Sequence, residues 1–135
     1  MSNKKLGNDF ETELCERLSE YGFWTHNMAM NKSGQPADVI AVRNGKAHLI
    51  DAKVCSNGKF ALSRVEENQT LAMDLWNDCG NGIGWFAIKL DKFDSKIYMV
   101  SYYTIKSYTG VQASLSAQEI FELGTPIERW MDKCK

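Results

Sequence analysis

Two apolar runs on either side of Asn44-Gly45 give the chain its clearest alternation of apolar and polar positions, within residues 35–53 (QPADVIAVRNGKAHLIDAK). Asn-Gly tolerates the positive φ angles of a type I′ turn, so the pattern predicts a two-residue β-hairpin. The turn sets the register, because side chains alternate between the two faces of a strand. The predicted pairs are Arg43 with Lys46, Val42 with Ala47, Ile40 with Leu49, and Asp38 with Asp51, with Lys53 on the face of Asp51.

Helical spacing of apolar residues precedes the hairpin, over residues 8–21. Asn8 and Glu11 fit a capping box at the start of this helix, and Gly22 fits its end. The expected apolar stripe consists of Phe10, Leu14, Leu18 and Tyr21. Residues 23–30 then read as an edge strand that leads into a loop at 31–36.

A second helical pattern follows the hairpin, after a turn at 56–59 and a short extended piece at 60–62. Ser63 and Glu66 form a capping-box pattern, and the helix is expected to run to about residue 78, before Gly80. Its core stripe is Val65, Ala72, Met73 and Trp76. Gln69 lies inside this stripe, where a side-chain amide requires a partner, and a satisfied core amide is the plain structural reading.

Residues 83–90 and 96–105 are rich in aromatic and β-branched side chains and are predicted to be two more strands of the hairpin sheet. The tail is predicted to be helical. A hydrophobic staple surrounds a capping box, Gly124 ends that helix, and Pro126 opens a last one. The staple and box residues are Leu115, Ser116, Glu119 and Ile120.

Length and composition predict one domain spanning residues 1–135 of the 135-residue chain, with a real core. No apolar run approaches the roughly 20 residues that span a bilayer, and the first residues lack the apolar region of a signal peptide. We therefore expect a cytoplasmic protein with no membrane contact. The four cysteines are scattered without a C-x-x-C pair, which favours neither a disulfide framework nor a zinc site.

Charge is distributed unevenly. Residues 1–64 hold nine Lys and Arg against seven Asp and Glu, and residues 65–135 hold seven against ten. If a cation neutralises the acidic residues of the first part, basic residues there become available for phosphates, although each could equally be an ordinary solvated residue. The candidate DNA-binding residues are Lys4, Lys5, Lys32, Arg43, Lys46, Lys59 and Arg64.

The hairpin end carries the candidate chemistry. Asp38 opposite Asp51 is destabilising unless a cation or a shared proton compensates, and carboxylate oxygens suit hard ions such as Mg²⁺. Such an ion would lower the pKa of an attacking water. Glu11 lies at the edge of a buried helix face, where it is either a further ligand or the capping residue described above. The alternative for the hairpin is that its polar end is simply solvated.

An acid in the first helix, an acid before the hairpin, D-x-K after it and Gln in the next helix resemble the PD-(D/E)xK nuclease superfamily. Residues 58–76 (GKFALSRVEENQTLAMDLW) and 82–90 (GIGWFAIKL) are similar to the RecU-type Holliday-junction resolvases. The resemblance implies an α/β fold with a mixed central β-sheet flanked by helices, a restriction-endonuclease-like nuclease core. Pro36 is separated from Asp38 by one residue, and the loop at 31–36 is short for the stalk of that family.

The resemblance also implies function. It identifies Glu11, Asp38 and Asp51 as metal ligands, Lys53 as the active-site lysine and Gln69 as a supporting amide. The expected activity is Mg²⁺-dependent cutting of four-way DNA junctions by paired phosphodiester cuts, with Mn²⁺ as a substitute ion. Alternatives are a restriction or repair nuclease of the same chemistry, or a non-catalytic DNA-binding module.

Resolvases of this kind work as two-fold dimers, so a homodimer is expected. The aromatic residues of 85–90 (WFAIKL) and 97–103 (IYMVSYY) could supply an apolar patch for pairing, or could instead fill the core of the monomer.

Overall fold

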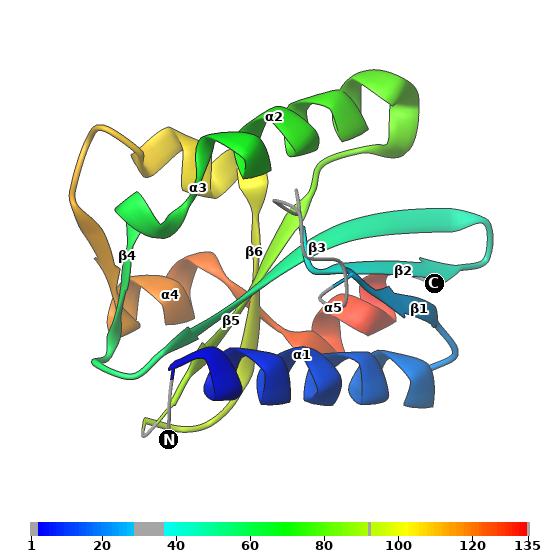
Figure 1. Cartoon of the computed structure of the whole chain (residues 1–135), viewed down its shortest axis with the longest axis horizontal. Coiled ribbons are helices and arrows are strands. Elements are labelled where there is room, and N and C mark those ends of the chain that lie inside the picture. The colour runs from blue at the N-terminus through cyan, green and yellow to red at the C-terminus, as the bar shows by residue number, and fades with distance from the viewer. Residues whose placement is uncertain (1–2, 29–36, 92, 135) are drawn as a thin grey trace.

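A mixed six-stranded sheet forms the middle layer of the molecule, with helices on both faces (Figure 1). The computed structural model describes residues 3–28, 37–91 and 93–134. Neighbouring strands are antiparallel except β3 and β5, which are parallel. In spatial order the strands are β1 (Trp24–Asn27), β2 (Val39–Arg43), β3 (Lys46–Cys55), β5 (Trp85–Leu90), β6 (Ile97–Ser101) and β8 (Thr125–Pro126).

Two apolar clusters fill the spaces between the sheet and its helices. Helices α1 and α5 cover one face, and α2, α3 and α4 cover the other, where the small sheet of β4 (Lys59–Ala61) and β7 (Ser114–Ser116) also lies. None of the helices in the described ranges is long and apolar enough to cross a membrane. The helical elements are α1 (Asn3–Glu20), the 3₁₀ turn η2 (Leu62–Arg64), α2 (Glu67–Trp76), the π turn η3 (Asn77–Asn81), α3 (Tyr102–Tyr108), α4 (Ala117–Leu123) and α5 (Ile127–Lys133).

The predicted hairpin is confirmed. Asn44 and Gly45 have φ angles of 54° and 78°, and Arg43 pairs with Lys46 across the turn. Regular pairing of β2 with β3 ends one position before the two aspartates, although the Asp38 N–H still donates to the Ile50 carbonyl at 3.1 Å. The two strands therefore separate at the acidic end of the hairpin.

Beyond this point β3 continues for five residues with β5 on one side and no strand partner on the other among the described residues. Side chains form hydrogen bonds with the backbone of this free edge instead. The Ala52 N–H donates to the Asp38 carboxylate at 2.8 Å, and the Val54 carbonyl accepts from Arg64 at 2.8 Å. A sheet edge held by side chains is open to another molecule in a way that a paired edge is not.

The first helix begins at Asn3 rather than near Asn8, so the predicted capping box of Asn8 and Glu11 is wrong. The Asn8 carbonyl lies inside the helix and accepts from the Thr12 hydroxyl at 3.1 Å. Straight-chain residues at 4–6 favour helix strongly enough to carry it past the Asn signal. At the other end Gly22, with φ of 88°, turns the chain as expected, and Tyr21 lies outside the stripe with 44% of its surface exposed.

The second helix also starts differently. Its capping box consists of Glu66 and Gln69, whereas Ser63 lies in the preceding turn η2. Leu62 is buried, and its N–H donates to the Ala113 carbonyl at 3.0 Å. That long-range contact fixes the chain at η2, so the helix begins only after it.

Residues 102–105, predicted to continue a strand, form the start of α3. Ser101 caps this helix by accepting the Thr104 N–H at 3.1 Å, and local capping overrides the strand propensity of the tyrosines. Of the predicted strands at 83–90 and 96–105, residues 85–90 and 97–101 are confirmed as parts of the main sheet. The predicted capping box at the start of α4 and the final helix α5 are confirmed as well.

Candidate active site

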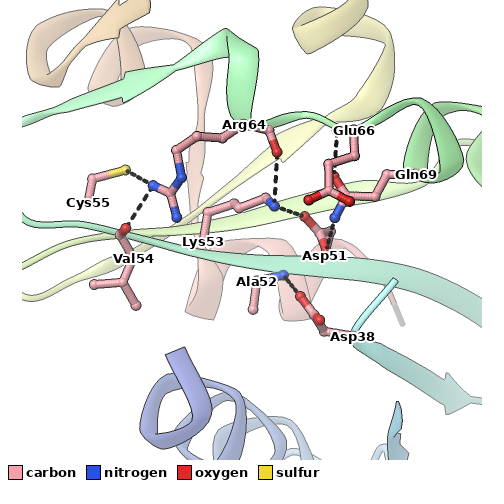
Figure 2. A network of polar contacts seen from close by, with 9 residues as sticks. All are labelled: Asp38, Asp51, Ala52, Lys53, Val54, Cys55, Arg64, Glu66 and Gln69. Atoms are coloured by element: carbon pink, nitrogen blue, oxygen red, sulfur yellow. Dashed lines mark hydrogen bonds and ion pairs between the residues drawn. The ribbon is translucent and has the colours of Figure 1, made fainter. Parts of the chain in front are cut away.

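The residues predicted from the hairpin meet where β2 and β3 separate (Figure 2). Asp51 lies in β3 and is fully buried. Its Oδ1 accepts a hydrogen bond from Gln69 Nε2 at 3.2 Å, and its Oδ2 lies 3.0 Å from Lys53 Nζ. The described residues give Oδ2 no hydrogen bond of good geometry, so one oxygen of the buried carboxylate is fixed and the other lies beside Lys53.

Burial raises the pKa of Asp51 well above its ordinary value, and the negative charge of Asp38 raises it further. The ammonium of Lys53 acts in the opposite direction but does not outweigh these effects. Asp38 and Asp51 therefore present two carboxylates to a single ammonium. This excess of acidic groups favours the binding of a proton or of an added cation.

Lys53 is held in place from the side of η2. Its ammonium donates to the Arg64 carbonyl at 3.2 Å, while the Arg64 guanidinium donates to the Val54 carbonyl at 2.8 Å and lies 3.7 Å from Cys55 Sγ. Arg64 thus fixes η2 to β3, and the backbone of η2 positions the lysine. The sequence interpretation listed Arg64 only as a phosphate contact, because nothing local indicates that it bonds a carbonyl ten residues earlier.

Gln69 links Asp51 to α2. Its Oε1 accepts the Glu66 N–H at 3.0 Å while its Nε2 donates to Asp51, so both ends of the amide are used and the side chain is 7% exposed. The capping box orients the amide, and the amide orients the carboxylate.

Asp38 stands at the first position before β2 and is half-buried. Its Oδ2 accepts the Ala52 N–H at 2.8 Å, which directs the carboxylate across the free edge of β3. The structure thereby brings Asp38, Asp51 and Lys53 together at one end of the hairpin.

Glu11 approaches the same group from α1. The residue is 9% exposed, and its Oε2 has no hydrogen-bond partner in the part of the chain that the structure describes. Burial raises the pKa of Glu11 to about 7 from an ordinary 4.5, with the Asp38 charge and a contact to Asp38 adding to the shift. Because Glu11 lies in the interior of α1, capping no longer explains why an acid is buried here.

A divalent metal fits the chemistry of these donors. Glu11 and Asp51 each hold a buried carboxylate oxygen without a hydrogen bond, and both carboxyls have raised pKa values beside Asp38. Oxygen donors with excess negative charge are what hard cations require. Among the described residues, no three Asp, Glu, His or Cys side chains lie grouped closely enough to hold one ion together. Mg²⁺ is commonly held by one or two carboxylates, with waters and substrate phosphates as its other ligands.

The structure places the candidate phosphate-contacting residues in different parts of the molecule. Lys59 and Arg64 line a cleft along the free edge of β3, and Lys5 lies exposed on α1, whereas Lys46 is exposed at the far end of the hairpin. Lys32 and the side chain of Lys4 lie outside the described residues.

Arg43 is engaged in the fold. Its guanidinium donates to the carbonyls of Tyr21, at 2.9 Å, and Met131, and lies 4.2 Å from the centre of the Phe23 ring. These contacts hold the ends of α1 and α5 against the hairpin turn, so we leave Arg43 out of the DNA-contacting surface.

Comparison with known proteins finds a matching family model and matching solved structures. The family model described as "Archaeal holliday junction resolvase (hjc)" matches residues 2–133. A solved structure of Hjc from Archaeoglobus fulgidus, described as a Holliday junction resolvase from an archaeal hyperthermophile, matches with a TM-score of 0.68. The match covers 93% of this chain and 98% of that chain at 15% identity, which shows a shared fold. No curated protein sequence matches the chain.

Proposed function

The chain belongs to the archaeal Holliday junction resolvase (Hjc) family, and we propose that Asp38, Asp51 and Lys53 form its cutting site, with Glu11 and Gln69 in support. Membership makes the protein an endonuclease of the PD-(D/E)xK superfamily that binds and resolves four-way DNA junctions. The observation that carries the assignment of the site is the buried Asp51 carboxylate beside Lys53, with one oxygen lacking a hydrogen bond. The finer similarity of residues 58–76 to RecU-type resolvases stays a prediction.

Resolvases of this family generally need divalent metal ions, and Mg²⁺ is our proposal for this chain, with Mn²⁺ as a substitute. Glu11, Asp38 and Asp51 would hold the ion, because their oxygens are the hard donors that the site offers. When bound, it supplies positive charge that stabilises the negative charge developing on the phosphate.

The described contacts of Lys53 support a positioning and charge-stabilising role. An ammonium carries three N–H donors, of which the Arg64 carbonyl accepts one, while the Asp51 carboxylate forms an ion pair with the charge. A remaining N–H can reach a phosphate oxygen or the attacking water. Holding the lysine by a backbone carbonyl keeps it from collapsing entirely onto Asp51.

Gln69 acts through Asp51 and is a positioning residue. Its hydrogen bond fixes Oδ1 and leaves Oδ2, which lies beside Lys53, as the oxygen that would bind an ion. An amide donor is suited to this task because it is neutral and leaves the negative charge of the carboxylate in place.

A cleavage assay tests the assignment. Purified protein is incubated with end-labelled four-way junction, flap, nicked and linear duplex DNA, with Mg²⁺ and with EDTA. We expect junction cutting only with the metal, and its loss in Asp38→Asn, Asp51→Asn and Lys53→Ala, with unchanged circular dichroism. Full activity of the Asp51→Asn protein would overturn the proposed site, and equal cutting of all substrates would favour a general nuclease.

We also propose that the protein acts as a homodimer. Resolving a junction of approximate two-fold symmetry requires paired cuts in opposing strands, which two copies related by a two-fold axis supply. Most of the aromatic residues named for this contact fill the core instead, the alternative given above: Phe86 is fully buried and Tyr98 is 8% exposed, whereas Tyr103 is 71% exposed. The outer face of α2 is a better surface, because Leu71 and Leu75 lie one turn apart with 61% and 63% exposure.

A further inference from the structure

A cleft of about 390 Å³ lies along the free edge of β3. One of its lining residues, Arg64, accepts a hydrogen bond from Lys53 through its carbonyl. Residues from four elements line it: Leu6 and Gly7 of α1, Ala52 and Val54 of β3, Lys59 of β4, and Arg64 of η2. Figure 1 shows the start of α1 facing the end of β3 across this part of the molecule. The walls of the cleft are up to 58 residues apart in the chain, so local sequence patterns do not predict it.

The size of the cleft suits one DNA strand rather than a whole duplex. Its volume of about 390 Å³ is at the lower end of the range for ligand pockets, about 300–1,000 Å³. A single strand, or the backbone of one strand at a branch point, is the form of DNA that can enter it.

The lining matches the chemistry of a sugar-phosphate chain. Lys59 and Arg64 bring two cations, and none of the described lining residues is acidic. Leu6, Ala52 and Val54 provide an apolar floor against which deoxyribose can pack. Cations contact phosphates without reading sequence, as a structure-selective nuclease requires.

Gly7 is the least expected residue of the lining. It occupies the interior of α1, where glycine is less favourable than alanine, and its backbone does not lie in the left-handed region that calls for glycine. A Cβ built on it would meet nothing within 4 Å, so packing within the protein does not require glycine either. Gly7 lies one turn before Glu11, so both residues share a helix face. A side chain at this position would project into the cleft.

We infer that this cleft holds the backbone of the strand being cut, on one side of the scissile phosphate, with Lys59 contacting a flanking phosphate and Gly7 keeping the surface of α1 low enough for the strand to pass. The inference rests on the proposed site at Asp51 and Lys53, and it adds how one strand of the junction reaches that site. Arg64 contributes charge to the same channel while fixing η2.

The first experiment separates ligand clearance from folding at Gly7. Gly7→Ala and Gly7→Leu are compared with Asn8→Ala, an exposed neighbour in α1 that does not line the cleft. Alanine at either position favours helix, so Gly7→Ala and Asn8→Ala should both raise the midpoint of thermal unfolding. We expect Gly7→Ala to lower kcat/KM for a four-way junction about tenfold, mainly through KM, and Gly7→Leu to lower it further, with less than a twofold change for Asn8→Ala. Cutting by Gly7→Ala at the wild-type rate would overturn the inference, and this variant decides the matter even if the leucine variant does not fold.

The second experiment locates the phosphate. Junctions carrying one neutral methylphosphonate linkage at successive positions are bound in EDTA and measured by fluorescence anisotropy. Wild type should lose about fivefold in affinity at a linkage next to the scissile one, and Lys59→Gln should bind the same junction no worse than the unmodified one. Lys133→Gln, at an exposed position of α5 that does not line the cleft, is the control that keeps full sensitivity. Sensitivity of Lys59→Gln equal to that of wild type at every linkage would overturn the phosphate contact. Because binding is measured without metal, failure of the cleft model is distinguished from failure to cut DNA at all.

Discussion

Gln69 donates a hydrogen bond to Asp51 Oδ1 across 3.2 Å, from the first turn of α2 to the middle of β3. The same side chain accepts the Glu66 N–H through Oε1 at 3.0 Å. The Gln69 amide therefore caps the start of α2 and also orients the buried Asp51 carboxylate. These two tasks can be separated experimentally, because one uses the oxygen and the other uses the nitrogen.

We predict that Gln69→Glu keeps the helix start but lowers junction cutting at least tenfold. The new carboxylate retains an acceptor for Glu66, loses the donor to Asp51, and places a like charge next to it. The loss of unfolding free energy should be larger at pH 8 than at pH 5, because a proton relieves the repulsion at the lower pH. Urea unfolding at both pH values and a cleavage assay check this; wild-type cutting by Gln69→Glu would contradict the positioning role.

We predict a pH-dependent stability difference for Glu11→Gln in EDTA. Because burial and the Asp38 charge raise the pKa of Glu11 to about 7 in the folded protein, the residue binds its proton more tightly when folded. The stability that this provides is complete below about pH 4.5 and is lost as the pH rises through 7. Glutamine does not titrate, so the variant should become more stable than wild type by up to about 3 kcal/mol above pH 7. A difference that does not change between pH 4.5 and pH 8 would show that Glu11 is not perturbed.

We predict that Mg²⁺ raises the Tm of the wild-type protein, and by more at pH 8 than at pH 5. A metal that binds only the folded state stabilises it, and at the lower pH the cation must displace protons from Glu11 and Asp51, whose pKa values are raised. Asp51→Asn should lose most of this gain. Differential scanning calorimetry with a titration of MgCl₂ provides the measurement, and an equal gain in Asp51→Asn would place the ion elsewhere.

We predict that Arg43→Met destabilises the protein by roughly 2–3 kcal/mol without weakening junction binding at a temperature where it stays folded. The substitution removes donors to the Tyr21 and Met131 carbonyls and the contact with the Phe23 ring. Arg43→Lys keeps the charge but cannot bridge both carbonyls, so it should lose stability too. If Arg43→Met instead kept its Tm and bound DNA with a shallower salt dependence, Arg43 would be a phosphate contact.

We predict that Leu71→Glu with Leu75→Glu gives a monomer. Both side chains are mostly exposed, so the substitutions should leave the Tm of the monomer nearly unchanged while charging the proposed contact. Light scattering at micromolar concentration measures the state, and Trp24→Glu, at 61% exposure on edge strand β1, is the matched control. A monomeric Trp24→Glu and a dimeric leucine variant would move the interface to β1.

A dimer also predicts a cutting pattern. A mixed dimer of wild type and Asp51→Asn should nick one strand of the junction and stop. Paired cuts by the mixed dimer would show that a single site can cut both strands in turn.

The sequence by itself determined the hairpin and the placement of its acids. Asn44-Gly45 requires positive φ at both residues, and once the turn is fixed, alternation places Lys53 on the face of Asp51 without reference to the rest of the chain. The same local logic identified the capping box at the start of α4 and the burial of Gln69. These features depend on neighbours a few residues away, so their energetics are contained in short segments.

The tertiary structure decided what depends on distant segments. Helix α2 begins later than predicted because the Leu62 N–H donates to the Ala113 carbonyl. Lys53 is positioned by the Arg64 carbonyl, and Arg64 is held by its hydrogen bond to the Val54 carbonyl. The raised pKa of Glu11 results from burial of α1 against the sheet next to Asp38, and no pattern within residues 8–21 encodes that approach. The cleft exists because β3 extends past its pairing with β2, which leaves one edge of β3 without a strand partner among the described residues. Residues of α1 and β4 border this edge. Such contacts follow from how whole elements pack, and short-range spacing cannot specify them.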